Sequence, residues 1–364
     1  MNTARQIVEE DCQTIVADLP SGRWKLLEGQ TILLTGPQGV LGSGILNTIE
    51  YLNRTLFHIP CQVIAIHRSP IIPNGILSHT LDNPQIQYLR SDASKNLRGA
   101  IEILRMRRRL RPVSHIIHAA GYSTPLIFTS QPIETFSINM GALQWLLPYA
   151  VEQDVGRFVW FSSAEIYGTT DRLMTEQDWG NTDPLGQRAC YVESKRCGEA
   201  FCLAYHKQQG VPVILFRPQL IYGPGLAITD RRAMAEFIKT ALLKEPITLQ
   251  DQGEAIRSYC YISDAMRLFW RAFFSPGALG EVFNIANTEN ISIYDLATLI
   301  HKLCDITIPV KRATTILNNL SLLSAPWKVG ASFEKAQKWF GWEPQVCLSE
   351  GLTRTITWNK GLYD

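Results

Sequence analysis

The chain has 364 residues, of which 46% are hydrophobic and 19% are charged, and its formal net charge at pH 7 is +2. These values are typical of a globular protein, and such a small net charge gives no general argument for nucleic-acid or membrane binding. No apolar stretch approaches transmembrane length, and Glu9, Glu10 and Asp11 leave no apolar leader, so we expect neither a membrane span nor a secretory signal.

The cysteine and histidine residues bear on the redox compartment and on metal binding. The eight cysteines include no Cys-x-x-Cys pair, which favours reduced thiols in a cytoplasmic protein. The seven histidines show no metal-ligand spacing, so we predict no metal site.

The first 29 residues precede the first predicted strand. Apolar residues recur at three- and four-residue intervals from Ile7 to Leu19, which predicts an amphipathic helix. We interpret residues 1–29 as an N-terminal helical extension that packs against the main body or against a partner subunit.

Residues 31–35 form a predicted buried strand that runs directly into a glycine-rich turn. Gly36, Gly39 and Gly42 follow with three-residue spacing, and an apolar helix comes next. Such glycines let the backbone approach a pyrophosphate, while the helix N-terminus offers amides and a positive dipole. The pattern predicts a dinucleotide site.

The next strand, residues 62–66, ends at His67 and Arg68. An NAD site usually has an acidic residue here for the ribose hydroxyls, whereas an arginine can pair with a 2′-phosphate. Arg68 therefore favours NADP slightly, and NAD remains open if Arg68 only stacks on the adenine. A third strand, residues 86–92, places Asp92 to hydrogen-bond the adenine.

A fourth strand, residues 114–118, runs into Ala119 and Ala120, whose small side chains leave room for the cofactor. His118 is predicted to be a packed, hydrogen-bonded residue. A helix over residues 133–147 carries Asn139 beside an apolar stripe, where it is expected to hold a buried water or backbone group.

The apolar run at residues 158–161 predicts another buried parallel strand, and it ends in serines and Glu165. Tyr191 and Lys195 stand four apart in a stretch of helical composition, so they share one helix face. A nearby ammonium would favour the phenolate and let Tyr191 take a proton from a substrate hydroxyl. Ser163 would hold that hydroxyl.

After a strand near residues 211–218 the alternation of strand and helix weakens. We expect a helix at 233–243, a short strand at 247–250, and a return of residues 282–285 to the main sheet. The predicted fold class is α/β, a Rossmann-type doubly wound parallel sheet with a smaller mixed C-terminal lobe for the substrate. The predicted domains are 30–218 with about 255–290 for NAD(P), and 219–254 with 291–364 for the nucleotide sugar.

Taken together, these motifs resemble the extended short-chain dehydrogenase/reductase family, in its nucleotide-sugar epimerase/dehydratase branch, over about residues 30–358. Residues 183–196 are most similar to UDP-glucuronate decarboxylases. The resemblance depends on an ordered set whose members are Gly36, Gly39, Gly42, His118-Ala-Ala, Asn139, Ser163, Tyr191, Lys195, Arg217-Pro, Tyr222-Gly-Pro and the segment from Arg257 to Asp264.

The resemblance implies transient oxidation at sugar C4 with a tightly bound, recycled NAD(P). Tyr191 would take the hydroxyl proton, Ser163 would steady the oxygen, Lys195 would tune Tyr191 and bind the nicotinamide ribose, and Asn139 would complete the catalytic set. Arg257, with Arg232, would bind the nucleotide diphosphate of the sugar substrate. Relatives commonly form homodimers by packing the helices of Asn139 and Tyr191 into a four-helix bundle.

The residues after Ser163 bear on the reaction subtype. Related 4,6-dehydratases carry an Asp-Glu pair there, and decarboxylases keep the glutamate, whereas this chain has Ala164 and Glu165. Glu165 is interpreted as a general base or a substrate contact, with a structural carboxylate as the alternative. Leu220 and Arg231 depart from the family pattern. We therefore favour decarboxylase-type or dehydratase-type chemistry, with a 4-epimerase, a net NADPH-dependent keto-sugar reductase and a non-catalytic binding protein as alternatives.

Overall fold

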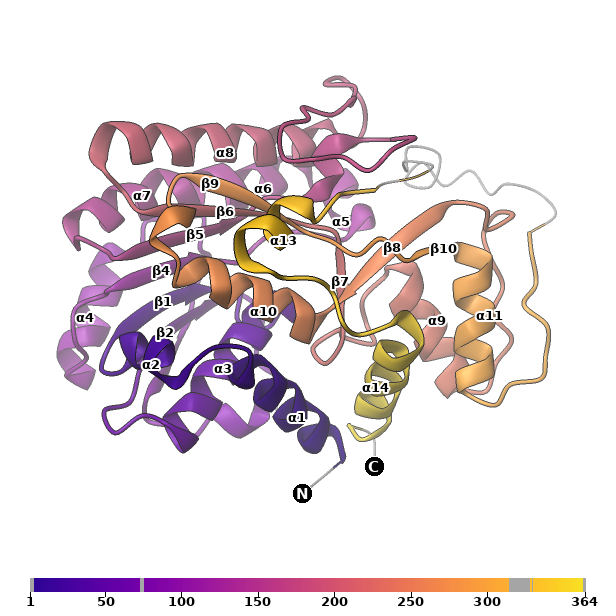
Figure 1. Ribbon diagram of the computed structural model, residues 1–364, viewed down its shortest axis with the longest axis horizontal. Coiled ribbons are helices and arrows are strands. Elements are labelled where there is room, and N and C mark those ends of the chain that lie inside the picture. Colours follow the sequence, from indigo (N-terminus) through magenta and orange to yellow (C-terminus); the bar gives the residue numbers. More distant parts are fainter. Residues whose placement is uncertain (1–2, 73–74, 314–327, 329, 363–364) are drawn as a thin grey trace.

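Seven strands form one parallel sheet in the order β3-β2-β1-β4-β5-β6-β9 in the computed structural model, which describes residues 3–72, 75–313, 328 and 330–362 (Figure 1). The chain winds outward from β1 in one direction and then returns to continue from β4, so the winding reverses between these two strands. Ligands of open α/β sheets bind at such a reversal. The strands are β1 (Thr31–Thr35), β2 (Gln62–His67), β3 (Ile86–Arg90), β4 (His115–His118), β5 (Arg157–Phe161), β6 (Val213–Pro218) and β9 (Glu281–Ile285).

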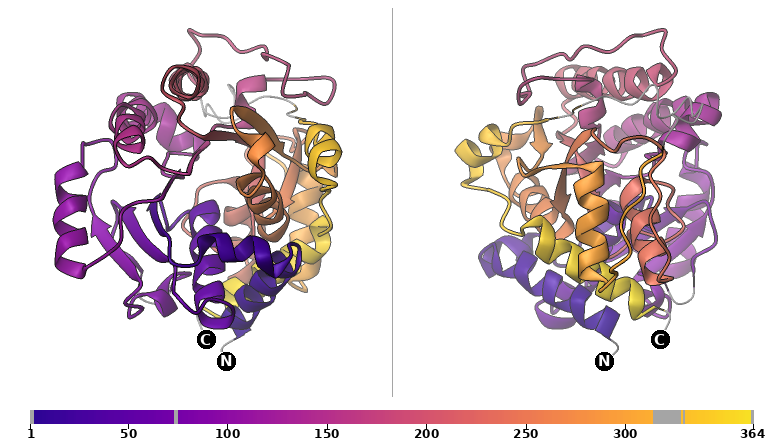
Figure 2. Two further views of the ribbon diagram at one scale, coloured as in Figure 1. Left: turned by 60° about the vertical axis from the view of Figure 1, so that its left-hand side comes forward. Right: turned by 90° about the vertical axis from the view of Figure 1, so that its right-hand side faces the viewer.

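Both faces of this sheet are buried, as expected for parallel strands with continuous apolar sequences. Alternate residues of β1 enter different cores: Ile32 and Leu34 face one, and Leu33 faces the other. The first core includes α3 (Val40–Thr55) and α10 (Ile262–Phe273), whereas the second includes α4 (Arg98–Arg108), α7 (Ala142–Glu152) and α8 (Ala189–Gln209) (Figure 2). The predicted doubly wound fold is confirmed.

A second, three-stranded sheet has the order β10-β8-β7, with β8 parallel to β7 and antiparallel to β10. The expected return of residues 282–285 to the large sheet is confirmed, because β9 pairs with β6. The expected strand at 247–250 is wrong: only Thr248 forms a bridge, to Lys311. The elements here are β7 (Leu220–Tyr222), α9 (Ala233–Leu242), β8 (Ile256–Tyr261), β10 (Asn290–Ser292), α11 (Ile293–Leu303), α13 (Glu334–Phe340) and α14 (Leu348–Lys360).

The N-terminal helix, α1 (Thr3–Ala17), lies beside α14 (Figures 1 and 2). Buried Asp11 accepts hydrogen bonds from the Tyr261 hydroxyl at 2.9 Å and from Nη2 of Arg354 at 2.9 Å. Farther along, Asp18 binds Nε of Arg267 at 2.8 Å and Nε of Arg271 at 2.5 Å. The extension is thus joined to α10 and to the last helix by ion pairs as well as by apolar packing. The division of the chain into domains at the predicted boundaries stays a prediction.

The segment expected as one helix over 133–147 is interrupted. It consists of α6 (Pro132–Phe136), a π-helical turn at Ser137–Gly141 and α7, preceded by α5 (Pro125–Ser130). A π-turn adds one residue to a helical turn and is frequent at functional sites. Asn139 lies in this turn. The short remaining helices are α2 (Ser21–Trp24), η1 (Lys25–Leu27), η2 (Ser78–Thr80), η4 (Ala164–Tyr167) and η5 (Pro276–Ala278).

Within the described parts of the chain, the helices are all too short or too polar to cross a membrane.

Candidate active site

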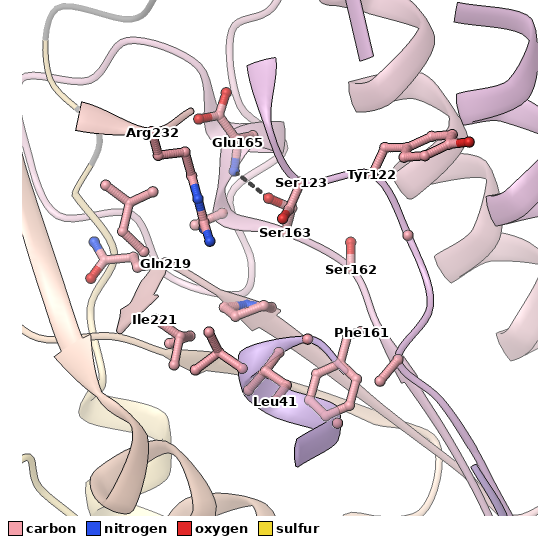
Figure 3. Close-up of a pocket in the computed structure, with 18 of the residues that line it drawn as sticks. Leu41, Tyr122, Ser123, Phe161, Ser162, Ser163, Glu165, Gln219, Ile221 and Arg232 are labelled. Carbon is pink, nitrogen blue, oxygen red and sulfur yellow. Dashed lines mark hydrogen bonds between the residues drawn. The ribbon is translucent and has the colours of Figure 1, made fainter. Parts of the chain in front are cut away.

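A cavity of about 280 Å³ lies at the carboxyl ends of β1, β4, β5 and β6, at the reversal of the winding. It extends from the glycine loop after β1 to β7 and β8 of the small sheet. Figure 3 shows Glu165, Ser163 and Arg232 as neighbouring residues of the lining. Of the predicted site residues, the lining includes Gly39, Gly42, Ala119, Ala120, Ser163, Glu165, Tyr191, Lys195, Arg232 and Arg257.

The glycine loop fits a dinucleotide. Gly36 has φ +72°, and a Cβ there would lie 2.7 Å from the backbone of Ala120, so only glycine fits. A Cβ on Gly42 would lie 2.1 Å from the Gly36 carbonyl oxygen. A Cβ on Gly39, by contrast, would meet protein only at 3.7 Å. The first and third glycines therefore allow close packing, and the second leaves space in the cavity at the N-terminus of α3 for a pyrophosphate.

The predicted adenosine contacts lie outside the cavity lining. The Arg68 guanidinium stacks over the Tyr122 ring, with Cζ 4.8 Å from the ring centroid, and donates to the Tyr122 hydroxyl. Oδ1 of Asp92 accepts from the backbone amide and hydroxyl of Ser94, at 2.9 and 2.8 Å. Contacts of Arg68 and Asp92 with a cofactor stay predictions.

His118 is packed and hydrogen-bonded, as predicted. Its Nδ1 lies 2.6 Å from Oγ1 of Thr35, and the same hydroxyl oxygen accepts from the Ala120 amide at 3.1 Å. Burial lowers the pKa of His118 to about 3, so the ring is neutral. This contact fixes the end of β4, where Ala119 and Ala120 line the cavity.

Tyr191 projects from the first turn of α8 and is almost fully buried. Its ring stacks on Phe128 with centroids 4.5 Å apart and planes 10° apart. Burial raises the pKa of Tyr191 to about 12, against a smaller lowering by the hydrogen bond with Ser163. Ser163 also caps the turn that follows, because its Oγ accepts from the Glu165 amide at 3.2 Å.

Lys195 has a different environment from the one expected. Its Nζ donates to the Phe161 carbonyl at 2.8 Å and lies 5.8 Å from the centroid of the Tyr191 ring. Burial lowers the pKa of Lys195 to about 7, and the charge of Glu199 opposes this only in part. The ammonium lies over the Tyr191 ring, as the spacing predicted, but the expected net lowering of the Tyr191 pKa is wrong, because desolvation of the buried phenol is the largest influence.

Asn139 is fully buried, and its Nδ2 donates to the Ser194 hydroxyl at 2.8 Å. It thus holds a side chain of α8, and the expected contact with a buried water stays a prediction. Its Oδ1 is buried without a hydrogen-bond partner among the described residues. A Cβ on Gly121 would lie 3.5 Å from this oxygen and 3.7 Å from Nζ of Lys195. The absence of a side chain at Gly121 keeps both polar atoms next to the cavity lining.

The end of the cavity opposite the glycine loop is lined by charged residues. Arg232 and Arg257 both line it, and Arg232 binds Oδ2 of Asp230 through Nε at 3.0 Å and Nη2 at 2.7 Å. Glu165 accepts from Nη2 of Arg188 at 2.7 Å. The sequence pattern did not single out Arg188, although its place three residues before Tyr191, next to the helix start, was a usable signal.

Gln219 is a second residue that sequence reasoning missed. It follows β6, lines the cavity and accepts from the Asn287 amide through Oε1 at 3.0 Å. Its Nε2 is buried and finds no acceptor in the described ranges. A polar residue beside Leu220, in the segment leaving a cavity-lining strand, was the available signal.

Comparison with known proteins agrees with this geometry. The model of the NAD dependent epimerase/dehydratase family matches residues 32–286. UDP-glucuronic acid decarboxylase 6 of Arabidopsis thaliana is 29% identical over 326 residues, which cover 88% of this chain and 86% of the plant protein.

Two solved structures share the fold. A dTDP-glucose 4,6-dehydratase from Streptomyces venezuelae superposes with a TM-score of 0.77 at 22% identity, covering 91% of this chain and 97% of that one. The UDP-glucuronic acid 4-epimerase from Bacillus cereus, in complex with UDP-glucuronic acid and NAD, gives 0.75 at 24% identity and covers 92% and 100%.

Proposed function

The chain belongs to the NAD dependent epimerase/dehydratase family, and on that premise we propose that it modifies a nucleotide sugar through transient oxidation at sugar C4. One observation carries the proposal: Ser163, Tyr191 and Lys195 line the same cavity as the glycine loop that fits a dinucleotide. This arrangement gives a proton acceptor, a hydroxyl that orients the substrate and a cation within one site.

In this mechanism Ser163 holds the C4 oxygen of the sugar, and Tyr191 takes the hydroxyl proton as a phenolate. Its own phenol proton must leave first, because burial raises the pKa of Tyr191 to about 12. A bound nicotinamide would supply a reversible hydride acceptor for C4, so that no net oxidant would be needed. Lys195 contributes a charge next to the cofactor ribose, and with a pKa of about 7 it exchanges its own proton near neutral pH. Tyr191 finally gives its proton back to the C4 oxygen.

The sugar step that we favour is decarboxylation. A ketone at C4 makes a carboxyl group on C5 a β-keto acid, so the bond from C5 to the carboxyl carbon breaks with its electron pair passing into the C4–C5 enolate. Carbon dioxide leaves, and C5 then takes up one proton. Glu165 supports this choice because it lines the cavity, and the matched plant decarboxylases cover most of the chain. Glu165 would contact the C5 substituent or carry the proton to C5.

For recognition, we propose that Arg232 and Arg257 bind the nucleotide diphosphate, since arginine matches phosphate geometry. The cofactor is proposed to be NADP, supported by Arg68 at the end of β2, where no carboxylate stands to bind the ribose. The NAD named for the Bacillus cereus epimerase supports the alternative.

We propose the oligomeric state and the cellular compartment from separate observations. The pairing of the Asn139 segment with α8 leaves apolar residues of α6 exposed, namely Ile133 and Phe136, and these suit a helix-bundle homodimer. Eight free cysteines support a reducing compartment, which for this chain would be the cytoplasm.

The test begins with mass spectrometry of small molecules released from the purified protein, which identifies NAD or NADP. UDP-glucuronate, UDP-glucose and dTDP-glucose are then supplied separately, and the products are followed by NMR. We expect UDP-glucuronate to lose carbon dioxide without net change in nicotinamide absorbance. Steady NADPH consumption with a keto-sugar would instead establish a net reductase, and no conversion of any sugar nucleotide would refute the proposal.

Replacement of Tyr191 by Phe provides the first specific prediction. Loss of the phenol removes the proton acceptor, and we expect turnover to fall by about 10³-fold with little change in cofactor content. The measurement is single-turnover reduction of bound nicotinamide at 340 nm. A variant with wild-type reduction would exclude Tyr191 from the chemistry.

A further inference from the structure

Arg188 holds an unusual position next to the proposed site. It immediately precedes α8, three residues before Tyr191, and its side chain is 12% exposed. Its Cζ lies 4.9 Å from the centroid of the Phe128 ring, and the Phe128 ring stacks in parallel on Tyr191. The guanidinium, the apolar ring and the proposed proton acceptor thus form one packed group.

The same guanidinium binds the other proposed catalytic side chain. Nη2 of Arg188 donates to Oε2 of Glu165 at 2.7 Å, and the Glu165 side chain is 25% exposed. The Glu165 backbone is separately fixed, because its amide donates to Ser163 and its carbonyl accepts from the Gly168 amide at 3.1 Å. The backbone of Glu165 is therefore set by the turn after β5, and the direction of its carboxylate is set by Arg188.

From this arrangement we propose that Arg188 is a positioning residue, which aligns the Glu165 carboxylate with the substrate carbon next to the one handled by Tyr191. The inference deepens the proposed function and rests on it. A charged arginine stacked on an aromatic ring keeps a defined orientation, and its ion pair transfers that orientation to the glutamate. Since Phe128 contacts both Arg188 and Tyr191, the separation of the two reacting groups is fixed by side-chain packing as well as by the backbone.

A purely structural ion pair fits the observations less well. Nε and Nη1 of Arg188 are buried and have no acceptor in the part of the chain that is described. Buried donors are normally satisfied, and an arginine retained for stability alone is expected to use more of its five N–H groups. The electrostatics agree with a role in the site: the charge of Glu165 raises the pKa of Tyr191, whereas the charge of Arg188 lowers it. Arg188 thus offsets the effect of a carboxylate next to the proton acceptor.

The test is a double-mutant cycle on carbon dioxide release from UDP-glucuronate in the full-length, cofactor-loaded protein. We expect Glu165→Gln to reduce kcat by about 10²-fold or more, and Arg188→Met by about 10²-fold through misplacement of Glu165. The double variant should be no slower than Glu165→Gln alone, because Arg188 has no effect without its partner. KM should change less than kcat, and Arg188→Lys should recover part of the rate because it restores a cation.

Arg172→Met is the matched control, since Arg172 pairs with Asp178 on an exposed loop and does not line the cavity. It should keep the wild-type rate. Independent, multiplicative losses in the double variant would overturn the inference, as would a wild-type rate for Arg188→Met. If Arg188→Met does not fold, as judged by circular dichroism, the cycle is run with Arg188→Lys and the same criterion. If the wild-type protein converts sugar nucleotides but the losses in the cycle are multiplicative, only the role of Arg188 is refuted. If the wild-type protein converts no sugar nucleotide, both proposals are contradicted.

Discussion

Two glutamate–arginine pairs join helix α8, or the residue before it, to other elements, and they differ in how completely the arginine is satisfied. Within α8, Glu199 binds Arg217 of β6 through two parallel bonds, Nε to Oε1 at 2.8 Å and Nη2 to Oε2 at 2.7 Å. Nη1 of Arg217 also donates to the Tyr167 hydroxyl at 2.8 Å and to the Glu176 carbonyl at 3.1 Å. At the start of the helix, Arg188 makes a single bond, to Glu165, and two of its nitrogens are buried without an acceptor among the described residues.

The contrast separates an ion pair that holds the fold from one that serves the site. A buried guanidinium with all its nitrogens bonded recovers the cost of desolvation, whereas one with orphaned donors does not. Proteins keep such locally unfavourable arrangements mainly where function requires them. Both pairs lie near the cavity, so distance from the site alone does not distinguish them.

The largest expected effect on stability comes from breaking the saturated pair. Arg217→Met leaves Glu199 buried without its partner, and we expect the free energy of unfolding to fall by about 3–5 kcal/mol. Urea denaturation followed by circular dichroism measures this loss. Arg172→Met, which removes an exposed ion pair, should cost less than about 1 kcal/mol. A loss of similar size in the two variants would remove the basis of the comparison.

Per pH unit, an intermediate effect on stability is expected from Lys195, which lies one helical turn before Glu199. Its pKa is about 7 in the folded protein against 10.5 as the ordinary value, so the unfolded chain binds more protons between these two pH values. The stability of the cofactor-free protein should therefore rise with pH from about 7 to 10.5, by up to about 1.4 kcal/mol per pH unit. Lys195→Met should reduce this pH dependence of stability, measured by thermal unfolding at several pH values. An unchanged pH dependence in the variant would mean that other titrating groups cause it.

The smallest effect on stability is expected from Arg188→Met. Glu165 is partly exposed and can be hydrated when its partner is lost, and the orphaned donors disappear with the guanidinium. We expect a change in unfolding free energy of less than about 1 kcal/mol, measured as for Arg217→Met, although catalysis falls strongly. A loss as large as that of Arg217→Met would place both pairs in the structural class.

Features encoded in short segments were predictable. The glycines after β1 and the apolar strand before Ser163 follow from local periodicity and turn chemistry, and parallel strands bring their carboxyl ends to one edge. That geometry is why Ser163 could be placed next to the glycine loop, whereas its association with Tyr191, 28 positions later on α8, depended on the resemblance to a known family.

Features that depend on burial and on side-chain direction were not predictable. The directions in which the pKa values of Tyr191 and Lys195 shift depend on desolvation. That desolvation exists only after α8 has packed on β5 and its neighbours. The bond between Arg188 and Glu165 joins positions 23 residues apart through chosen rotamers, and the π-turn at Asn139 has no strong local pattern. For these features tertiary contacts, and not local preference, decide the outcome.

The contact between α1 and α14 has a consequence for folding during synthesis on the ribosome. The ion pair of Asp11 with Arg354 spans 343 positions, so the partner of an early helix leaves the ribosome roughly 20–70 s after it at typical elongation rates. During that interval α3 can cover part of α1, but the apolar face that meets Trp358 has no partner yet. A nascent chain stalled before α14 should therefore bind chaperones that recognise apolar helices, and completion of α14 should release it.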